Sequence, residues 1–158
     1  MQALLSIVTK ENSIEQVIDS ILHYQTLGIS IFLLSGDIGI GKTFLVSHYA
    51  KKIHAKGVSS PSFSFIQEYS IPNQTIHINY DKHIDNIPSI YHYDLYLKDY
   101  SLVKYELFES ISKQGVHFIE WGNKEIATQI DKLGFSNILI EIKVNNNERI
   151  YEFYSFAK

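Results

Sequence analysis

The sequence has 158 residues, the size of one ordinary domain, and its hydrophobic content of 45% is enough to bury a substantial core. A net charge of −3 and a pI of about 6.1 argue against direct, high-affinity binding to a nucleic acid backbone, which requires a basic face on the protein. There is no cysteine, which excludes disulfides and thiolate chemistry. No segment resembles a leader peptide or is apolar enough to span a membrane, so we expect a cytoplasmic protein with no membrane association.

The first elements expected along the chain are a helix, a strand and a second helix. Apolar residues recur at helical spacing over 11–23, and Ser13 followed by Gln16 fits a capping box for that helix. Residues 30–35 form a short apolar run between glycines, which is typical of a buried strand. A helix is predicted over 42–54, directly after the glycine-rich turn that follows the strand.

Alternating polar and apolar residues predict strands in the rest of the chain. The stretches 62–70 and 75–82 both alternate, and the turn-forming IPNQ between them predicts that they pair as a hairpin. The remaining elements expected are a strand over 89–97, a helix over 103–111, a strand over 115–121, a helix over 123–133 and a two-stranded hairpin over 137–156. This order indicates an α/β sheet to which the hairpins add antiparallel strands.

The glycine-rich turn carries the most specific chemical signal. Gly36, Gly41, Lys42 and Thr43 match the pattern G-x-x-x-x-G-K-S/T, between a strand and a helix. In such a loop, backbone N–H groups and the helix N-terminus hold phosphates, the lysine reaches the β- and γ-phosphates, and the threonine hydroxyl ligates Mg²⁺. Because the guanine-reading N-K-x-D pattern is absent, we expect ATP rather than GTP. The predicted fold class is a single-domain α/β, P-loop NTPase-like three-layer fold over residues 1–158, with a mixed, partly antiparallel sheet.

Two acidic residues end predicted strands, where the Mg²⁺ of such a site needs a carboxylate. Asp94 lies in YHYDLY and Glu120 in VHFIEW, and with Lys42 they are the candidate catalytic residues. One carboxylate would hold the ion, directly or through water, and the other would orient the attacking water; which does which stays open. The hydroxyls of the SSPSF loop, 59–63, could sense the γ-phosphate, with an ordinary turn as the alternative.

The histidines and the single tryptophan are assigned structural roles. His77, His83 and His92 lie among the predicted strands without metal-ligand spacing, so we expect them to pack or to face solvent. Trp121 is expected in the core, with a place at the edge of the site as the alternative because it follows Glu120.

Four segments together resemble the TsaE (YjeE) family, the bacterial P-loop ATPases required for the threonylcarbamoyladenosine modification of tRNA. They are GDIGIGKT, SPSF, HYDLYL and IEW, which stand in the family's order and spacing, and the resemblance covers nearly the whole chain. The resemblance implies Mg²⁺ at Thr43 and Glu120, with Asp94 as the Walker B-like aspartate. It also implies contacts to ATP or ADP at Glu11, Asn12, Ile38, Gly39, Ile40, Gly41, Lys42, Thr43, Ser62 and Arg149.

The resemblance further implies an ATPase that is slow alone and acts with the TsaB–TsaD heterodimer, with tRNA bound only through these partners. Arg149 is the only arginine in the sequence, which fits a site that needs charge from a partner; its alternative role is a cross-strand ion pair with Glu141. Leu97 stands where the family has an arginine, and Lys98 is not expected to replace it because side chains alternate along a strand. The segment 71–89 is longer than expected for the family, and an added hairpin there would alter a partner surface.

Two other functions remain as alternatives. A small P-loop kinase that phosphorylates a small molecule usually clamps the transferred group with lid arginines, and a single arginine makes this a poor match. A nucleotide-binding module without turnover would bind ATP and never release ADP, even with partners present. An ADP product without a phosphorylated acceptor would favour the ATPase over both.

Overall fold

The computed structural model describes residues 1–10, 13–55, 61, 64–71, 76–79, 82–84 and 87–156. Within these residues, a seven-stranded sheet in the order β1-β9-β8-β2-β7-β6-β3 runs through the fold, and β4 and β5 form a separate two-stranded sheet. In chain order the elements are β1 (Gln2–Lys10), α1 (Glu15–Thr26), β2 (Ile31–Ser35), α2 (Lys42–Lys52), β3 (Ile66–Ser70), β4 (Ile76–Asn79), β5 (Lys82–Ile84), β6 (Ser89–Asp94), α3 (Tyr100–Ser110), β7 (Val116–Glu120), α4 (Lys124–Lys132), β8 (Asn137–Asn145) and β9 (Glu148–Ser155).

The four central strands of the large sheet are parallel to one another. β2 pairs with both β7 and β8, and β6 pairs with β7. The outer strands join antiparallel, with β3 on β6, β9 on β8 and β1 on β9. The predicted mixed, partly antiparallel sheet is therefore confirmed. The carboxyl ends of β2, β6 and β7 meet at one edge, which is where open α/β sheets hold their ligands.

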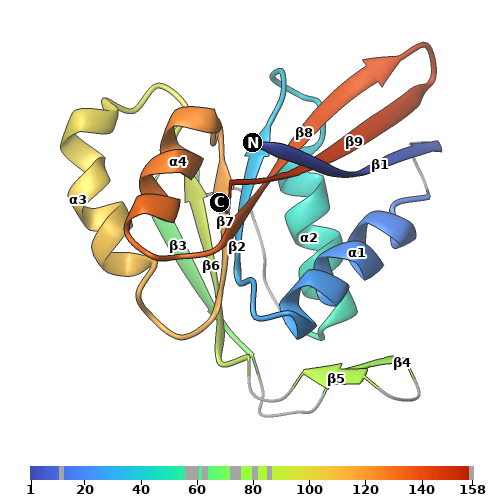
Figure 1. The fold of residues 1–158 in the computed structure, drawn as a ribbon, viewed down its shortest axis with the longest axis horizontal. Helices are drawn as coiled ribbons and strands as arrows, with labels where there is room; N and C mark the ends of the chain where they lie inside the picture. The colour runs from blue at the N-terminus through green and yellow to red at the C-terminus, as the bar shows by residue number, and fades with distance from the viewer. Residues whose placement is uncertain are drawn as a thin grey trace.

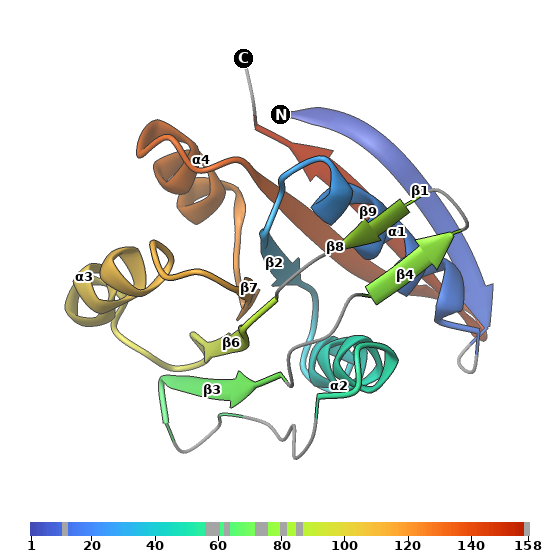
Figure 2. The same cartoon turned by 90° about the horizontal axis from the view of Figure 1, so that it is seen from below.

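Helices cover both faces of this sheet, with α1 and α2 on one face and α3 and α4 on the other (Figure 1, Figure 2). Along β2, Phe32 and Leu34 belong to the core beneath α1 and α2. Ile31 and Leu33 belong to the core beneath α3 and α4. Because β2 is buried on both faces, it reads as a continuous apolar run. The predicted three layers are thus confirmed.

The predicted hairpin of 62–70 with 75–82 is wrong. β3 pairs with β6 instead, and β4 pairs with β5 in a small hairpin beside α1 (Figure 1). All six residues of β6 are buried, so its outer edge requires a partner strand to complete its backbone hydrogen bonds. Glu68 of β3 strengthens this pairing by accepting hydrogen bonds from the hydroxyls of Ser89 and Tyr91 at 2.7 and 3.2 Å.

The N-terminal part of the chain also differs from expectation. β1 is not among the predicted strands, because only Ile7 and Thr9 along it are buried and no clear alternation results. α1 begins at Glu15, and its N-cap residue Ile14 makes no side-chain cap hydrogen bond, so the predicted capping box is wrong. The other predicted helices and strands are confirmed with ends shifted by a few residues. No helix in the described part of the chain combines the length and apolar character that crossing a bilayer requires.

Candidate nucleotide-binding site

The turn between β2 and α2 has the backbone of a phosphate-binding loop. Gly36 and Gly41 have φ angles of 147° and 110°, a region that L side chains rarely adopt. A Cβ on Gly36 would lie 2.7 Å from the carbonyl oxygen of Ile142 on β8, so no side chain fits there. Gly41 is the N-cap of α2, which leaves the first N–H groups of that helix without helical acceptors at the loop. The loop and helix N-terminus together suit an anion.

Lys42 folds back over this loop. It is 4% exposed, and its ammonium donates hydrogen bonds to the carbonyl oxygens of Gly36 and Asp37 at 2.8 and 2.9 Å. Burial lowers the pKa of the ammonium, and the nearby carboxylates of Glu120, Asp94 and Asp37 oppose this shift. An anion held by the loop would therefore compete with the loop's own carbonyls for the charge of Lys42.

Trp121 lies against the ammonium of Lys42. The Lys42 Nζ atom is 3.6 Å from the centre of the indole ring, a distance typical of a cation–π interaction. The ring of Tyr96 packs beside the indole, with centroids 4.7 Å apart. Trp121 is only partly buried, packs against the core on one side and lines the cavity described below, which favours the alternative of a place at the edge of the candidate site.

Three polar side chains from the first turn of α2, from β6 and from β7 meet beside the loop. Thr43 Oγ1 donates a hydrogen bond to Glu120 Oε1 at 2.7 Å, and Nε2 of His92 lies 2.7 Å from the same oxygen. Glu120 and His92 are 4% and 0% exposed. The sequence reasoning missed the link between His92 and the site. The available signal is its position two residues before Asp94, which puts both side chains on one face of the strand.

Asp94 and Glu120 end neighbouring parallel strands at the same level. The register of β6 and β7 pairs these two residues directly, and both are buried. Asp94 Oδ1 accepts a hydrogen bond from the backbone N–H of Tyr96 at 2.9 Å, which fixes the turn after β6. The structure therefore brings together the two strand-end carboxylates that the sequence predicts.

A cavity of about 480 Å³ opens over these groups. Its volume lies in the range of small-molecule and cofactor sites. The phosphate-binding loop, both carboxylates and three aromatic side chains form its lining, at Ile38, Gly39, Gly41, Lys42, Thr43, Phe44, Asp94, Tyr96, Glu120 and Trp121.

Arg149 contacts the loop from β9. Its Nε donates a hydrogen bond to the carbonyl oxygen of Ile40 at 2.9 Å. The register of β8 and β9 places Val144 opposite Arg149 and Glu152 opposite Glu141, so the alternative of a cross-strand pair between Arg149 and Glu141 is wrong. Ile40 and Arg149, two residues predicted to contact the nucleotide, thus contact each other at the loop.

Some predicted residues lie outside the described part of the chain. They are Glu11, Asn12 and Ser62, with most of the 59–63 loop. Leu97 lies in a turn after β6, with a φ of 54° and 87% exposure, so the argument from strand alternation that separates it from Lys98 is wrong. The long segment 71–89 contains the β4–β5 hairpin.

The oxygen donors of this cavity could hold a hard cation. Thr43 supplies a hydroxyl, and Asp94 and Glu120 supply carboxylates, which are the ligand types that Mg²⁺ prefers. In the described residues, no group of three or more His, Cys, Asp or Glu side chains is placed to hold a metal by itself. Since protein-bound Mg²⁺ usually takes one or two carboxylates and completes its shell with water and phosphate, the donor set fits that ion.

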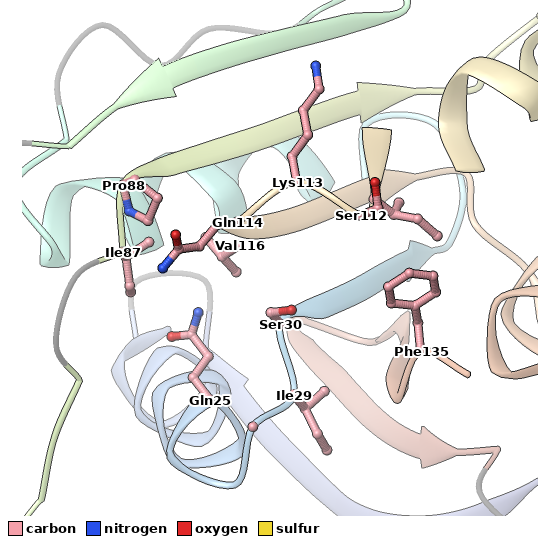
Figure 3. A pocket seen from close by; sticks show the side chains of 13 residues that line it. Gln25, Ile29, Ser30, Ile87, Pro88, Ser112, Lys113, Gln114, Val116 and Phe135 are labelled. Carbon is pink, nitrogen blue, oxygen red and sulfur yellow. The ribbon is translucent and has the colours of Figure 1, made fainter. Parts of the chain in front are cut away.

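A different cavity, of about 320 Å³, lies at the opposite edge of the sheet, near the beginnings of β2, β6 and β7 (Figure 3). Gln25, Gln114 and Phe135 help to line it, and among the described residues Lys113 is the only charged one in the lining. The part of its lining that the structure describes contains no carboxylate for a cation. Because open α/β sheets bind ligands at the carboxyl ends of their strands, the loop cavity is the better candidate for a ligand site.

Comparisons with known proteins agree with this geometry. The family model described as threonylcarbamoyl adenosine biosynthesis protein TsaE matches residues 8–151. Two proteins named tRNA threonylcarbamoyladenosine biosynthesis protein TsaE, from Rickettsia typhi and Rickettsia conorii, are 32% and 33% identical over 126 residues, which span 76% of this chain and 74% and 61% of theirs. The crystal structure of YdiB from Bacillus subtilis is similar in fold, with a TM-score of 0.54 and 19% identity over 99% of this chain and 89% of that one.

Proposed function

The chain belongs to the TsaE family, and on that premise we propose that it is a Mg²⁺-dependent ATPase required for the threonylcarbamoyladenosine modification of tRNA. The observation that carries the proposal is the 2.7 Å contact between the P-loop hydroxyl, Thr43 Oγ1, and a strand-end carboxylate, Glu120 Oε1. In the proposed site this contact would join the part that binds phosphate to the part that binds the metal, because both residues line one cavity. We propose that residues 1–158 form one P-loop ATPase domain that works in the cytoplasm.

The phosphates of ATP or ADP would bind to the backbone N–H groups of residues 38–43, at the N-terminus of α2. Lys42 would then exchange the carbonyl oxygens of Gly36 and Asp37 for phosphate oxygens. The exchange replaces neutral acceptors with charged ones, and charge-assisted hydrogen bonds are shorter and stronger. Competition between the two sets of acceptors makes the position of Lys42 dependent on the nucleotide.

Mg²⁺ would be held by Thr43 and Glu120, with Asp94 in support. The Thr43 hydroxyl gives its hydrogen to Glu120, which leaves the lone pairs of Oγ1 available for a cation. When bound, Mg²⁺ would neutralise charge on the β- and γ-phosphate oxygens. Asp94, on the neighbouring strand, is proposed to orient the attacking water.

Hydrolysis is proposed to be slow in the isolated chain and to be completed by the TsaB–TsaD heterodimer. Arg149 is the only arginine in the sequence, and its Nε is hydrogen-bonded to the loop carbonyl of Ile40. A guanidinium placed on the transferring phosphoryl group is worth roughly 10³–10⁵ in rate, whether it is supplied in cis or in trans. The net charge of −3 supports the proposal that tRNA binds to the partners and not to this chain directly.

The test is phosphate release from ATP, measured with Mg²⁺ or EDTA and with or without the heterodimer. We expect Mg²⁺-dependent turnover that rises when the partners are added. Glu120→Gln keeps the side-chain shape and removes the charge, so it should suppress turnover while ATP binding, measured by calorimetry, persists. The matched control is Glu106→Gln on the exposed side of α3, which should turn over like the wild type.

Three results would contradict the proposal. An unchanged rate in Glu120→Gln would exclude that carboxylate from the metal site. A phosphorylated small-molecule acceptor would favour a kinase. Nucleotide binding without turnover, even with partners present, would favour a binding module.

A further inference from the structure

We propose that His92 is a positioning residue that holds the Glu120 carboxylate in the orientation required for the metal, a role that rests on the proposed ATPase function. His92 lies on β6 two residues before Asp94, so both side chains leave the strand on the same face. Nε2 of His92 is 2.7 Å from Glu120 Oε1, and the imidazole is fully buried. The contact spans 28 positions of sequence and joins β6 to β7.

The hydrogen bond from His92 has one direction. An ionised carboxylate can only accept hydrogen bonds, so in the contact with Glu120 the Nε2 atom of His92 carries the hydrogen and donates it. Nδ1 is buried and has no hydrogen-bond partner among the described residues. By contrast, both ring nitrogens of the buried His117 have partners, the Tyr93 hydroxyl at 2.9 Å and the Lys113 carbonyl at 3.0 Å.

This contrast separates a structural histidine from a positioning one. Burying an unsatisfied ring nitrogen is unfavourable, and an apolar side chain would fill the same space without that penalty. Neighbouring buried positions on the same face, Ile90 on β6 and Phe118 on β7, are apolar. What His92 offers that an apolar residue does not is its hydrogen bond to Glu120.

Two donors act on one oxygen of Glu120. Thr43 Oγ1 approaches Oε1 from α2, and His92 Nε2 approaches the same atom from β6. No hydrogen bond from the described residues reaches Oε2, which is therefore the oxygen left for the metal or for a metal-bound water. Donors from two separate elements fix the plane of the carboxylate, as hydrogen-bond partners of metal ligands typically do.

His92 is the more rigid of these two donors. It belongs to a strand whose six residues are all buried, whereas Thr43 begins a helix at the loop and would itself bind the metal. Without His92, Glu120 would depend on a hydroxyl whose own contacts change with the ligand. Removing such a partner typically lowers metal affinity by about 10- to 100-fold.

The test compares three variants by calorimetric binding of a non-hydrolysable ATP analogue, in EDTA and across a Mg²⁺ titration. His92→Leu removes the donor. His92→Asn offers an amide nitrogen only near the Nδ1 position, and His92→Gln offers one near the Nε2 position. We expect the Mg²⁺ concentration for half-maximal effect to rise by roughly 10- to 100-fold in the Leu and Asn variants and to return close to the wild-type value in the Gln variant. Metal-free affinity should stay within about twofold in all three, since no loop contact changes.

A purely structural role gives a different pattern. If metal-free and Mg²⁺-dependent binding weaken together, or if Gln and Leu shift the titration equally, the positioning role is wrong. If His92→Leu fails to fold, the comparison of Gln with Asn decides in the same way. A wild-type protein that binds the analogue without any response to Mg²⁺ would overturn the proposed function and this role together. A wild type that responds to Mg²⁺, with Leu and Asn variants whose Mg²⁺ titrations match it, would overturn this role alone.

Discussion

Replacing Lys42 with methionine tests the phosphate site most directly. The change keeps a side chain of similar length and removes an ammonium that bonds to two loop carbonyls at 2.8 and 2.9 Å and lies 3.6 Å above Trp121. A hydrogen bond to a charged group contributes about 1.5–3 kcal/mol, which corresponds to a loss of affinity of roughly 10- to 150-fold. The free protein already gives the ammonium two acceptors, which reduces the net loss.

A second effect makes the loss of nucleotide affinity larger. Removing the ammonium leaves the carboxylates of Asp94 and Glu120 close to the loop without their nearby cation, and they would repel phosphate. This repulsion grows with the charge of the ligand, so we expect an ATP analogue to lose more affinity than ADP.

Calorimetry with both nucleotides gives the affinities, and Trp121 fluorescence gives an independent signal because it is the only tryptophan and lies against Lys42. Lys51→Met, at an exposed position of the same helix, is the matched control and should bind like the wild type. If Lys42→Met binds the ATP analogue as tightly as the wild type does, the assignment of phosphates to this loop is wrong.

Two further predictions concern the loop's support and the core. Arg149→Lys and Arg149→Ala both lack the Nε donor to Ile40, so each should weaken nucleotide binding by roughly 2- to 10-fold in the same calorimetric assay, and a Lys variant equal to the wild type would contradict this reasoning. Burial lowers the pKa of His117 to about 4 from 6.5, so the unfolded chain binds more protons between these pH values. About 3 kcal/mol of stability present above pH 6.5 should therefore be lost as the pH falls toward 4. His117→Gln should flatten that part of a curve of unfolding free energy against pH, and parallel curves for the two proteins would count against it.

The parts of the candidate site that could be predicted are those that a short, contiguous sequence pattern indicates. The loop from Gly36 to Thr43 is a local pattern, and Asp94 and Glu120 each end a local apolar run. Their meeting follows from a general property of parallel strands, whose carboxyl ends lie at one edge.

The parts that could not be predicted depend on register between distant segments. His92 reaches Glu120 only because β6 and β7 align Asp94 with Glu120, and nothing in the spacing of histidines signals that contact. Arg149 reaches Ile40 across 109 positions of sequence, through the pairing of β9 with β8.

The pairing partners of β3 and β1 could not be predicted for related reasons. β3 and β4 carry alternating patterns that suit a hairpin, but the buried β6 has a free edge that β3 covers more effectively. β1 has only two buried side chains, so its place in the sheet depends on backbone pairing with β9 and leaves little trace in the hydrophobic pattern.

The pairing of β1 with β9 also sets an order of events during synthesis on the ribosome. Gln2 of β1 lies opposite Ser155 of β9, so β1, the first strand of this sheet in the sequence, can pair with its partner only after the sheet's other strands have been translated. At about 5–20 residues per second, β1 stays without this partner while the residues between β1 and β9 are translated. Arg149 arrives on the same late strand and brings the hydrogen bond to Ile40 with it. A nascent chain is thus expected to complete the support of the loop from Gly36 to Thr43 only after β9 has been translated, so chains that lack β9 would bind a ligand at this loop without that support.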